Sequence, residues 1–81
     1  MLDMNTAKIV KKAIDEHFNT KKNGEIMSLE DVVRMTPVSK AGRGGAYTIL
    51  SAQFGDMTIL VWIQFNDTLG VCVRAVKTQA W

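Results

Sequence analysis

The sequence predicts an α+β fold, with two N-terminal helices packed on one face of a three-stranded antiparallel β-meander. In the first 36 residues, apolar side chains recur at spacings of three and four, as in amphipathic helices. After residue 46 they alternate with a period of two around short turn sequences, which is typical of strands. The chain has 81 residues, of which 47% are hydrophobic, enough for one small core. We therefore predict a single domain with a helical part at 5–36, a glycine-rich loop at 37–45 and the meander at 46–78.

The first helix is predicted over residues 6–18. Its buried stripe would consist of Val10, Ala13, Ile14 and Phe18. Asp3 or Asn5 can cap the first turn. By the same spacing His17, the single histidine, falls near the centre of the buried stripe. We therefore expect a core or boundary side chain there rather than a catalytic base.

The second helix is predicted to begin after Ser28 and to be shorter than the first. Ser28 can accept the backbone N–H of Asp31, and the Asp31 carboxylate can accept the backbone N–H of Ser28, as in a capping box. Pro37 restricts Thr36 to extended conformations, so the helix should end by about Met35.

The register of the meander follows from its turns. Gly55 and Asp56 form a two-residue hairpin turn, with Gly55 supplying the positive φ. This turn places Phe54 opposite Met57, Ala52 opposite Ile59 and Leu50 opposite Val61. A second turn at 66–70 places Phe65 opposite Val71, Ile63 opposite Val73 and Val61 opposite Ala75. One face is then apolar across all three strands, and we expect the helices to cover it.

The second face of the sheet is also rich in apolar side chains, where a face in water would alternate to polar residues. Its predicted contact residues are Tyr47, Ile49, Leu60, Trp62, Arg74 and Val76. Trp62 would lie opposite Arg74, as a cation–π pair worth about 0.5–1 kcal/mol. Three interpretations compete: a homodimer or partner-protein interface, a nucleic-acid platform on which Tyr47 and Trp62 stack bases, and a surface covered by the N-terminal residues or by the tail through Trp81.

Basic residues suggest a second contact surface, although the net charge is only +2. Between residues 32 and 55 the chain has three basic residues and no acidic one. Glycine amides beside lysine and arginine can form an anion-binding nest, but the same loop can be a plain flexible connector. It is not a P-loop, because no Gly-Lys-Ser/Thr follows between a strand and a helix. The candidates for anion or nucleic-acid contact are Lys40, Arg43, Gly44 and Gly45 of the loop and Lys8, Lys11 and Lys12 of the first helix.

The sequence contains few residues that could act in catalysis or bind a metal ion. With one histidine and one cysteine, no zinc site of standard type can form within one chain. The single Cys72 excludes an intrachain disulfide and fits a reduced, cytoplasmic setting. The longest apolar run covers 59–63, whereas a membrane span needs about 20 residues, and the start does not resemble a signal peptide. We predict no catalytic residue, no metal ligand, no cofactor, no small-molecule substrate and no membrane partner.

These observations favour a small cytoplasmic, non-enzymatic protein of the regulatory or inhibitor type. It would act by protein–protein contacts through the second face of its sheet, as a homodimer, with Trp62 as the main contact. The alternative is an RNA- or DNA-binding module that uses the basic glycine-rich loop and the exposed lysines. Salt separates the two, because phosphate contacts weaken steeply with ionic strength and apolar contacts do not.

Overall fold

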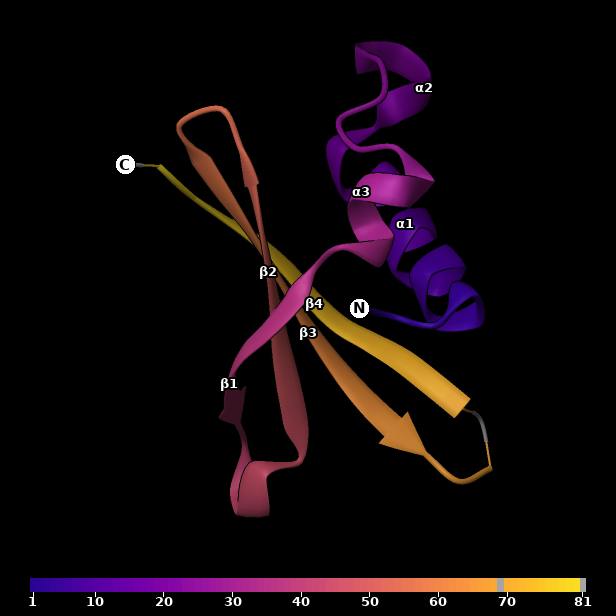
Figure 1. The fold of residues 1–81 in the computed structure, drawn as a ribbon, viewed down its shortest axis with the longest axis vertical. Coiled ribbons are helices and arrows are strands. Elements are labelled where there is room, and N and C mark those ends of the chain that lie inside the picture. Colours follow the sequence, from indigo (N-terminus) through magenta and orange to yellow (C-terminus); the bar gives the residue numbers. More distant parts are fainter. Residues whose placement is uncertain (69, 81) are drawn as a thin grey trace.

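The structure, a computed structural model, describes residues 1–68 and 70–80. The elements in chain order are α1 (Met4–Phe18), α2 (Thr20–Asn23), α3 (Leu29–Val33), β1 (Thr36–Ala41), the 3-10 turn η1 (Arg43–Gly45), β2 (Tyr47–Phe54), β3 (Met57–Asn66) and β4 (Gly70–Ala80). The fold is α+β, as predicted, and the four strands form one antiparallel sheet in the order β1-β2-β3-β4 (Figure 1).

The sheet has one strand more than the sequence predicted. Residues 37–45 are expected from the sequence to be a loop, but residues 37–41 belong to β1, which pairs with β2. As an edge strand it forms a ladder on one side only, so Pro37 can be accommodated without a backbone N–H. The register also shifts between Pro37 and Ser39, which removes any regular alternation. Because five of its six residues are exposed, β1 carries no apolar pattern that would have revealed it.

The helices begin and end at clear caps. Asp3 caps α1 by accepting the backbone N–H of Thr6 at 3.3 Å, so the helix begins at Met4. Asn19 ends it in a left-handed conformation with φ 51°, and the short α2 follows where a polar turn was predicted. The capping box of α3 is confirmed: Ser28 and Asp31 exchange two hydrogen bonds, each 3.1 Å long. No helix in the described part of the chain is long and apolar enough to cross a membrane.

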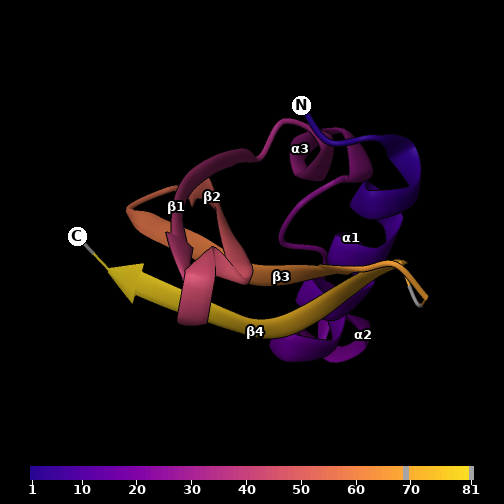
Figure 2. The ribbon, with the colours of Figure 1, turned by 90° about the horizontal axis from the view of Figure 1, so that it is seen from below.

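The core lies between the helices and one face of the sheet. It consists of Ala7, Val10 and Ile14 from α1, Met27, Val32 and Met35 from α3 and its flanks, and Leu50, Ile59, Val61 and Ile63 from β2 and β3. Seen from below, the helices gather at one side of the sheet, while the far end of the β2–β3 hairpin and the C-terminal end of β4 extend away from them (Figure 2). The predicted two-layer arrangement is therefore present.

The strand registers are as predicted until a bulge in β4. Phe54 pairs with Met57 across the first hairpin, and Ile63 pairs with Val73 across the second. The next pair is Trp62 with Ala75, which leaves Arg74 as an extra residue in β4. Three further predicted pairs are confirmed: Ala52 with Ile59, Leu50 with Val61 and Phe65 with Val71.

The bulge reverses the faces of the residues that follow it. The predicted pairing of Val61 with Ala75 is wrong, because Val61 pairs with Val76. Val76 was predicted on the second face, but it packs against the core. If β4 alternated regularly from Val73 onward, with Arg74 paired to Trp62, Lys77 would face the helices, where its charge would need a partner. The bulge therefore places a valine in the core and turns the lysine outward.

Candidate functional site: the open face of the sheet

The helices cover only one face of the sheet, and we call the opposite face the open face. Its members follow from the pairings and from the alternation of side chains along each strand. They are Ser39 and Ala41 of β1, Tyr47, Ile49, Ser51 and Gln53 of β2, Thr58, Leu60, Trp62 and Gln64 of β3, and Cys72, Arg74, Ala75, Lys77 and Gln79 of β4. Five of the six predicted contact residues, all but Val76, are therefore brought onto one surface.

Trp62 lies at the centre of the open face. It belongs to the inner strand β3, with Ile49 opposite on β2 and Ala75 opposite on β4. The predicted cation–π pair with Arg74 is wrong; the cation over the indole is Lys77, whose Nζ lies 4.9 Å from the ring centroid. The bulge is the cause, because it moves Arg74 out of register with Trp62 and brings Lys77 onto the same face.

Arg74 has a different partner on the open face. Its Nε donates a hydrogen bond of 2.8 Å to Oε1 of Gln64, the next open-face residue of β3 beyond Trp62. The side chain is exposed, so its guanidinium keeps further donors free to face solvent. Lys77 and Arg74 therefore flank Trp62 from the β4 side, one over the ring and one beside it.

The open face is partly covered by its own side chains. Ile49 is only 9% exposed and Thr58 only 8%, although both lie on the face opposite the helices. Trp62, Leu60 and Tyr47 are half-buried. Trp62 is therefore not sealed beneath α1, and the aromatic surface is continuous with buried apolar side chains that hold it in place. The sequence also left open that the C-terminal tail through Trp81 covers this face. Trp81 lies outside the described part of the chain.

Tyr47 is positioned by the glycine-rich turn. A Cβ atom added to Gly42, which has φ +81°, would lie 2.8 Å from Cδ2 of the Tyr47 ring. The ring therefore packs on bare backbone at the end of the β1–β2 hairpin. Only glycine allows both this conformation and this close approach.

The same turn leaves less room for an anion nest than the sequence suggested. Residues Arg43–Gly45 form a 3-10 turn in which the N–H of Gly45 donates to the carbonyl of Gly42 at 3.1 Å. The Gly45 amide is therefore engaged within the turn and does not point to an anion. Lys40 and Arg43 are exposed at this end of the molecule, and Gly44 is exposed beside them.

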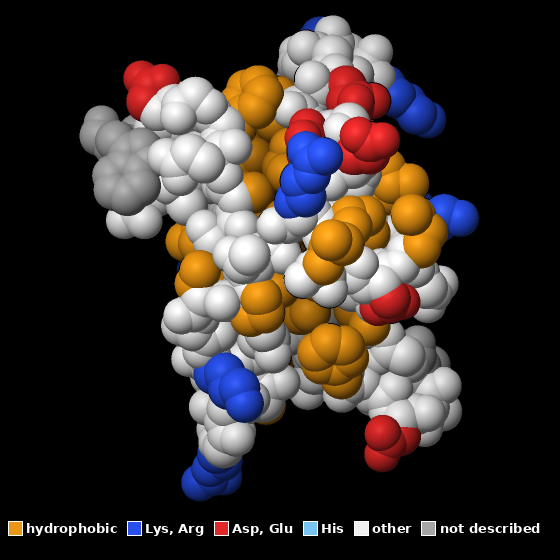
Figure 3. Space-filling view, viewed as in Figure 1, with side chains coloured by type: hydrophobic (Ala, Val, Ile, Leu, Met, Phe, Trp, Pro, Cys, Tyr) orange, Lys and Arg blue, Asp and Glu red, His pale blue; other side chains and the backbone are white. Residues whose placement is uncertain are grey.

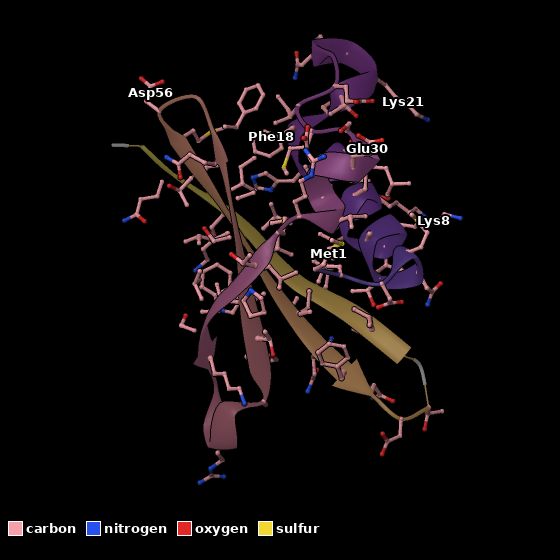
Figure 4. All side chains as sticks on the ribbon, in the orientation of Figure 1. Met1, Lys8, Phe18, Lys21, Glu30 and Asp56 are labelled. Atoms are coloured by element: carbon pink, nitrogen blue, oxygen red, sulfur yellow. The ribbon has the colours of Figure 1, made fainter. Side chains whose placement is uncertain are left out.

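The lysines of α1 are not brought together with the open face. Lys11 is held inside the helical layer, where Nζ donates to the Met27 carbonyl at 2.9 Å and lies 3.3 Å from an Asp15 oxygen and 3.7 Å from a Glu25 oxygen. Lys8 and Lys12 are exposed, and Lys8 projects from α1 away from the sheet (Figure 4). The predicted basic candidates therefore lie on separate sides of the molecule.

The acidic residues lie in the helical part and in the hairpin turns, and none lies on the strands. The strands contain three basic residues, Lys40, Arg74 and Lys77, and no acidic one. Six of the eight acidic residues fall within residues 3–31, and the other two, Asp56 and Asp67, lie in the two hairpin turns. In Figure 3 the red side chains gather over the helices and at the turns, whereas the charged side chains at the lower left end, where η1 lies, are blue.

The histidine and the cysteine offer little for catalysis. His17 is exposed, and its ring meets the edge of Phe18 at 4.9 Å between centroids. The prediction of a place in the buried stripe is wrong, because the last turn of α1 is buried only through Ile14 and, in part, Phe18. Cys72 is half-buried on the open face. Among the described residues, no cluster of three or more His, Cys, Asp or Glu side chains could hold a metal ion.

Two hollows lie on the helical side of the molecule. One, of about 330 Å³, lies between α3 and the end of β2, and Figure 3 shows it near the top. Its carboxylate, that of Asp31, already accepts the backbone N–H of Ser28. The other, of about 460 Å³, is bordered by Met1, Met4 and Val33 among others. Neither is lined by His17 or Cys72, and the first is bordered in part by Ser51 and Gln53 of β2.

No family model matches the sequence, and no curated protein or solved structure matches it either.

Proposed function

We propose that this chain is a non-enzymatic binding protein of the regulatory or inhibitor type, which docks another macromolecule against the open face. The observation that carries the proposal is the position of Trp62, an aromatic side chain at the centre of a sheet face that none of the described helices covers. Large aromatic side chains surrounded by partly buried apolar neighbours are the usual centres of binding surfaces.

The chemistry of the described side chains supports binding over catalysis. A general base or nucleophile needs a partner within hydrogen-bond reach in a sheltered pocket. His17 is exposed, with its ring against the edge of Phe18, and Cys72 has no histidine on its face of the sheet. The open face instead combines apolar area with amide, hydroxyl and cationic groups, which is the composition of a docking surface.

The sequence favoured a homodimer, and the charges on the open face bear on that choice. In a twofold dimer the same patch meets itself. Arg74 and Lys77 would then approach a surface whose strands offer no acidic partner. A partner that carries negative charge satisfies both cations, so we place it ahead of a second copy.

Substitution of Trp62 tests the proposal. Phe65→Ala is the matched control, because Phe65 is an exposed aromatic on the same strand but on the opposite face. We expect Trp62→Ala to abolish capture of the partner from an extract of native cells, or self-association in sedimentation, while Phe65→Ala retains it. Circular dichroism checks that both variants fold.

A second variant distinguishes a loss of binding from a loss of folding. Lys77 is exposed, so Lys77→Glu changes the charge beside Trp62 without touching the core. If neither Trp62→Ala nor Lys77→Glu alters capture or self-association, the open face is not the binding surface.

A further inference from the structure

The groups around Trp62 indicate the chemistry of the partner. Resting on the function proposed above, we propose that the open face binds single-stranded nucleic acid. Bases would stack on Trp62 and Tyr47, and phosphates would meet Lys77, Arg74 and Arg43.

The charge pattern is complementary to a polyanion. Arg74 and Lys77 flank Trp62, and Arg43 follows Gly42, on whose backbone the Tyr47 ring packs. No acidic residue lies on any of the strands, so an anion that crosses the open face meets no repulsive side chain. A backbone of repeated phosphates can use cations at the β4 side and at η1 together, which a single small anion cannot.

The two aromatic rings are near enough to act together. Ile49 pairs with Trp62, and Tyr47 is the next residue of β2 on the same face. Tyr47 and Trp62 are therefore diagonal neighbours, about 7–8 Å apart at the backbone. Aromatic side chains on an open sheet are the usual platforms on which unpaired bases stack.

The lysine over Trp62 does not block such stacking. Lys77 is exposed, and an exposed cation–π contact is weaker than the stacking of a base on an aromatic side chain. A base that stacks on the indole therefore displaces the ammonium group. The freed ammonium then lies beside the phosphate of the stacked nucleotide.

The same groups distinguish a single strand from other polyanions. A duplex keeps its base faces inside the stack, so it offers nothing to Trp62 and Tyr47. An acidic peptide matches the cations but supplies no flat ring system for the aromatic pair. The combination of exposed cations with two neighbouring aromatic rings therefore favours unpaired nucleotides.

Fluorescence anisotropy tests the inference. The probes are labelled oligothymidylate and oligouridylate of about twelve nucleotides, titrated at several salt concentrations. We expect the wild-type chain to bind either or both. Trp62→Ala should weaken binding about tenfold with little change in the salt slope. Lys77→Gln and Arg74→Gln should each lower the slope of log K against log salt by about 0.7. Phe65→Ala and Lys12→Gln, an aromatic and a cation away from the open face, should behave as wild type.

Three outcomes overturn the inference. If polyglutamate or base-free polyphosphate binds as tightly as the oligonucleotides and is indifferent to Trp62→Ala, the partner is another acidic chain. If a duplex binds as tightly as a single strand, base stacking is not the basis of recognition. If no oligonucleotide binds, the inference is wrong, although the proposed function stands as long as Trp62→Ala still abolishes capture. If Trp62→Ala does not fold, the salt slopes of Lys77→Gln and Arg74→Gln test the inference instead, and unchanged slopes in both variants would overturn it.

Discussion

The ammonium group of Lys77 lies 4.9 Å from the centre of the Trp62 ring. Two neighbouring strands provide this pair only because Arg74 is an extra residue in β4. Strict alternation from Val73 onward would have turned Lys77 toward the helices. A single bulge thus places Val76 against the core and Lys77 next to Trp62, the central aromatic residue of the open face.

Removal of the lysine should uncover the indole. In a Trp81→Phe background, where Trp62 is the remaining tryptophan, Lys77→Gln should increase quenching of tryptophan fluorescence by acrylamide. The free energy of unfolding should change by no more than about 1 kcal/mol, because an exposed cation–π pair is worth little more. Arg74→Gln serves as the control, since Arg74 bonds Gln64 instead. Equal quenching in all three proteins would contradict the contact.

Deletion of the bulge residue should be tolerated. Without Arg74, Val73 and Ala75 become consecutive and still pair with Ile63 and Trp62, so no other side chain changes face. The expected cost is about 1 kcal/mol, chiefly for the lost hydrogen bond to Gln64. Urea unfolding measures it.

A deletion inside β2 is the contrasting control. Without Ser51, one end of the strand must shift by a residue, and either Leu50 or Ala52 then leaves the core face. We expect this variant not to fold. A bulge deletion as damaging as the Ser51 deletion would show that Arg74 is needed for more than its own hydrogen bond.

Two glycines of the same turn should respond differently to alanine. At Gly42 a Cβ would meet the Tyr47 ring at 2.8 Å, whereas at Gly44 nothing lies within 4 Å. Both have positive φ, so each substitution costs about 1–2 kcal/mol for conformation alone. Gly42→Ala should cost more, and it should displace Tyr47, which near-ultraviolet circular dichroism can detect. Similar losses of stability would argue against packing of the ring on Gly42.

The cap of α1 should make folding sensitive to acid. Hydrogen bonds from the Thr6 side chain and backbone lower the pKa of the Asp3 carboxyl below its ordinary value. A carboxyl with a lowered pKa stabilises the fold above its unfolded pKa of about 4, and this contribution disappears as pH falls through the folded value. Asp3→Asn retains an acceptor but does not titrate. Thermal unfolding should therefore show a smaller loss between pH 6 and pH 2.5 in Asp3→Asn than in wild type, and an identical loss would refute the contribution.

The sequence was informative wherever a strand was regular and half-buried. The pairing of Leu50 with Val61, and the shared face of Ile49 and Trp62, were predictable because β2 and β3 alternate without interruption on both sides of the Gly55 turn. The Ser28–Asp31 capping box was predictable for a similar reason, since it depends on local spacing alone.

The errors arose where tertiary packing overrides local pattern. β1 is exposed along most of its length, so no alternation marked it as a strand. The bulge did leave a trace, because the spacing of Val71, Val73 and Val76 changes from two to three. That change predicts a shift of face before Val76, and with it the outward position of Lys77. The exposure of His17 had no such sign, because it depends on where α1 extends beyond the sheet.

The uneven distribution of acidic residues has a kinetic consequence. A net charge of +2 conceals an electric dipole, since residues 1–31 hold six acidic and five basic residues, whereas residues 32–81 hold two acidic and five basic ones. In the electric field of a polyanion, such a molecule orients with its sheet toward the polyanion before any contact is made. Encounter with the proposed single-stranded nucleic acid should therefore become faster as salt is lowered, while the lifetime of that complex should depend on the short-range contacts of the aromatic rings.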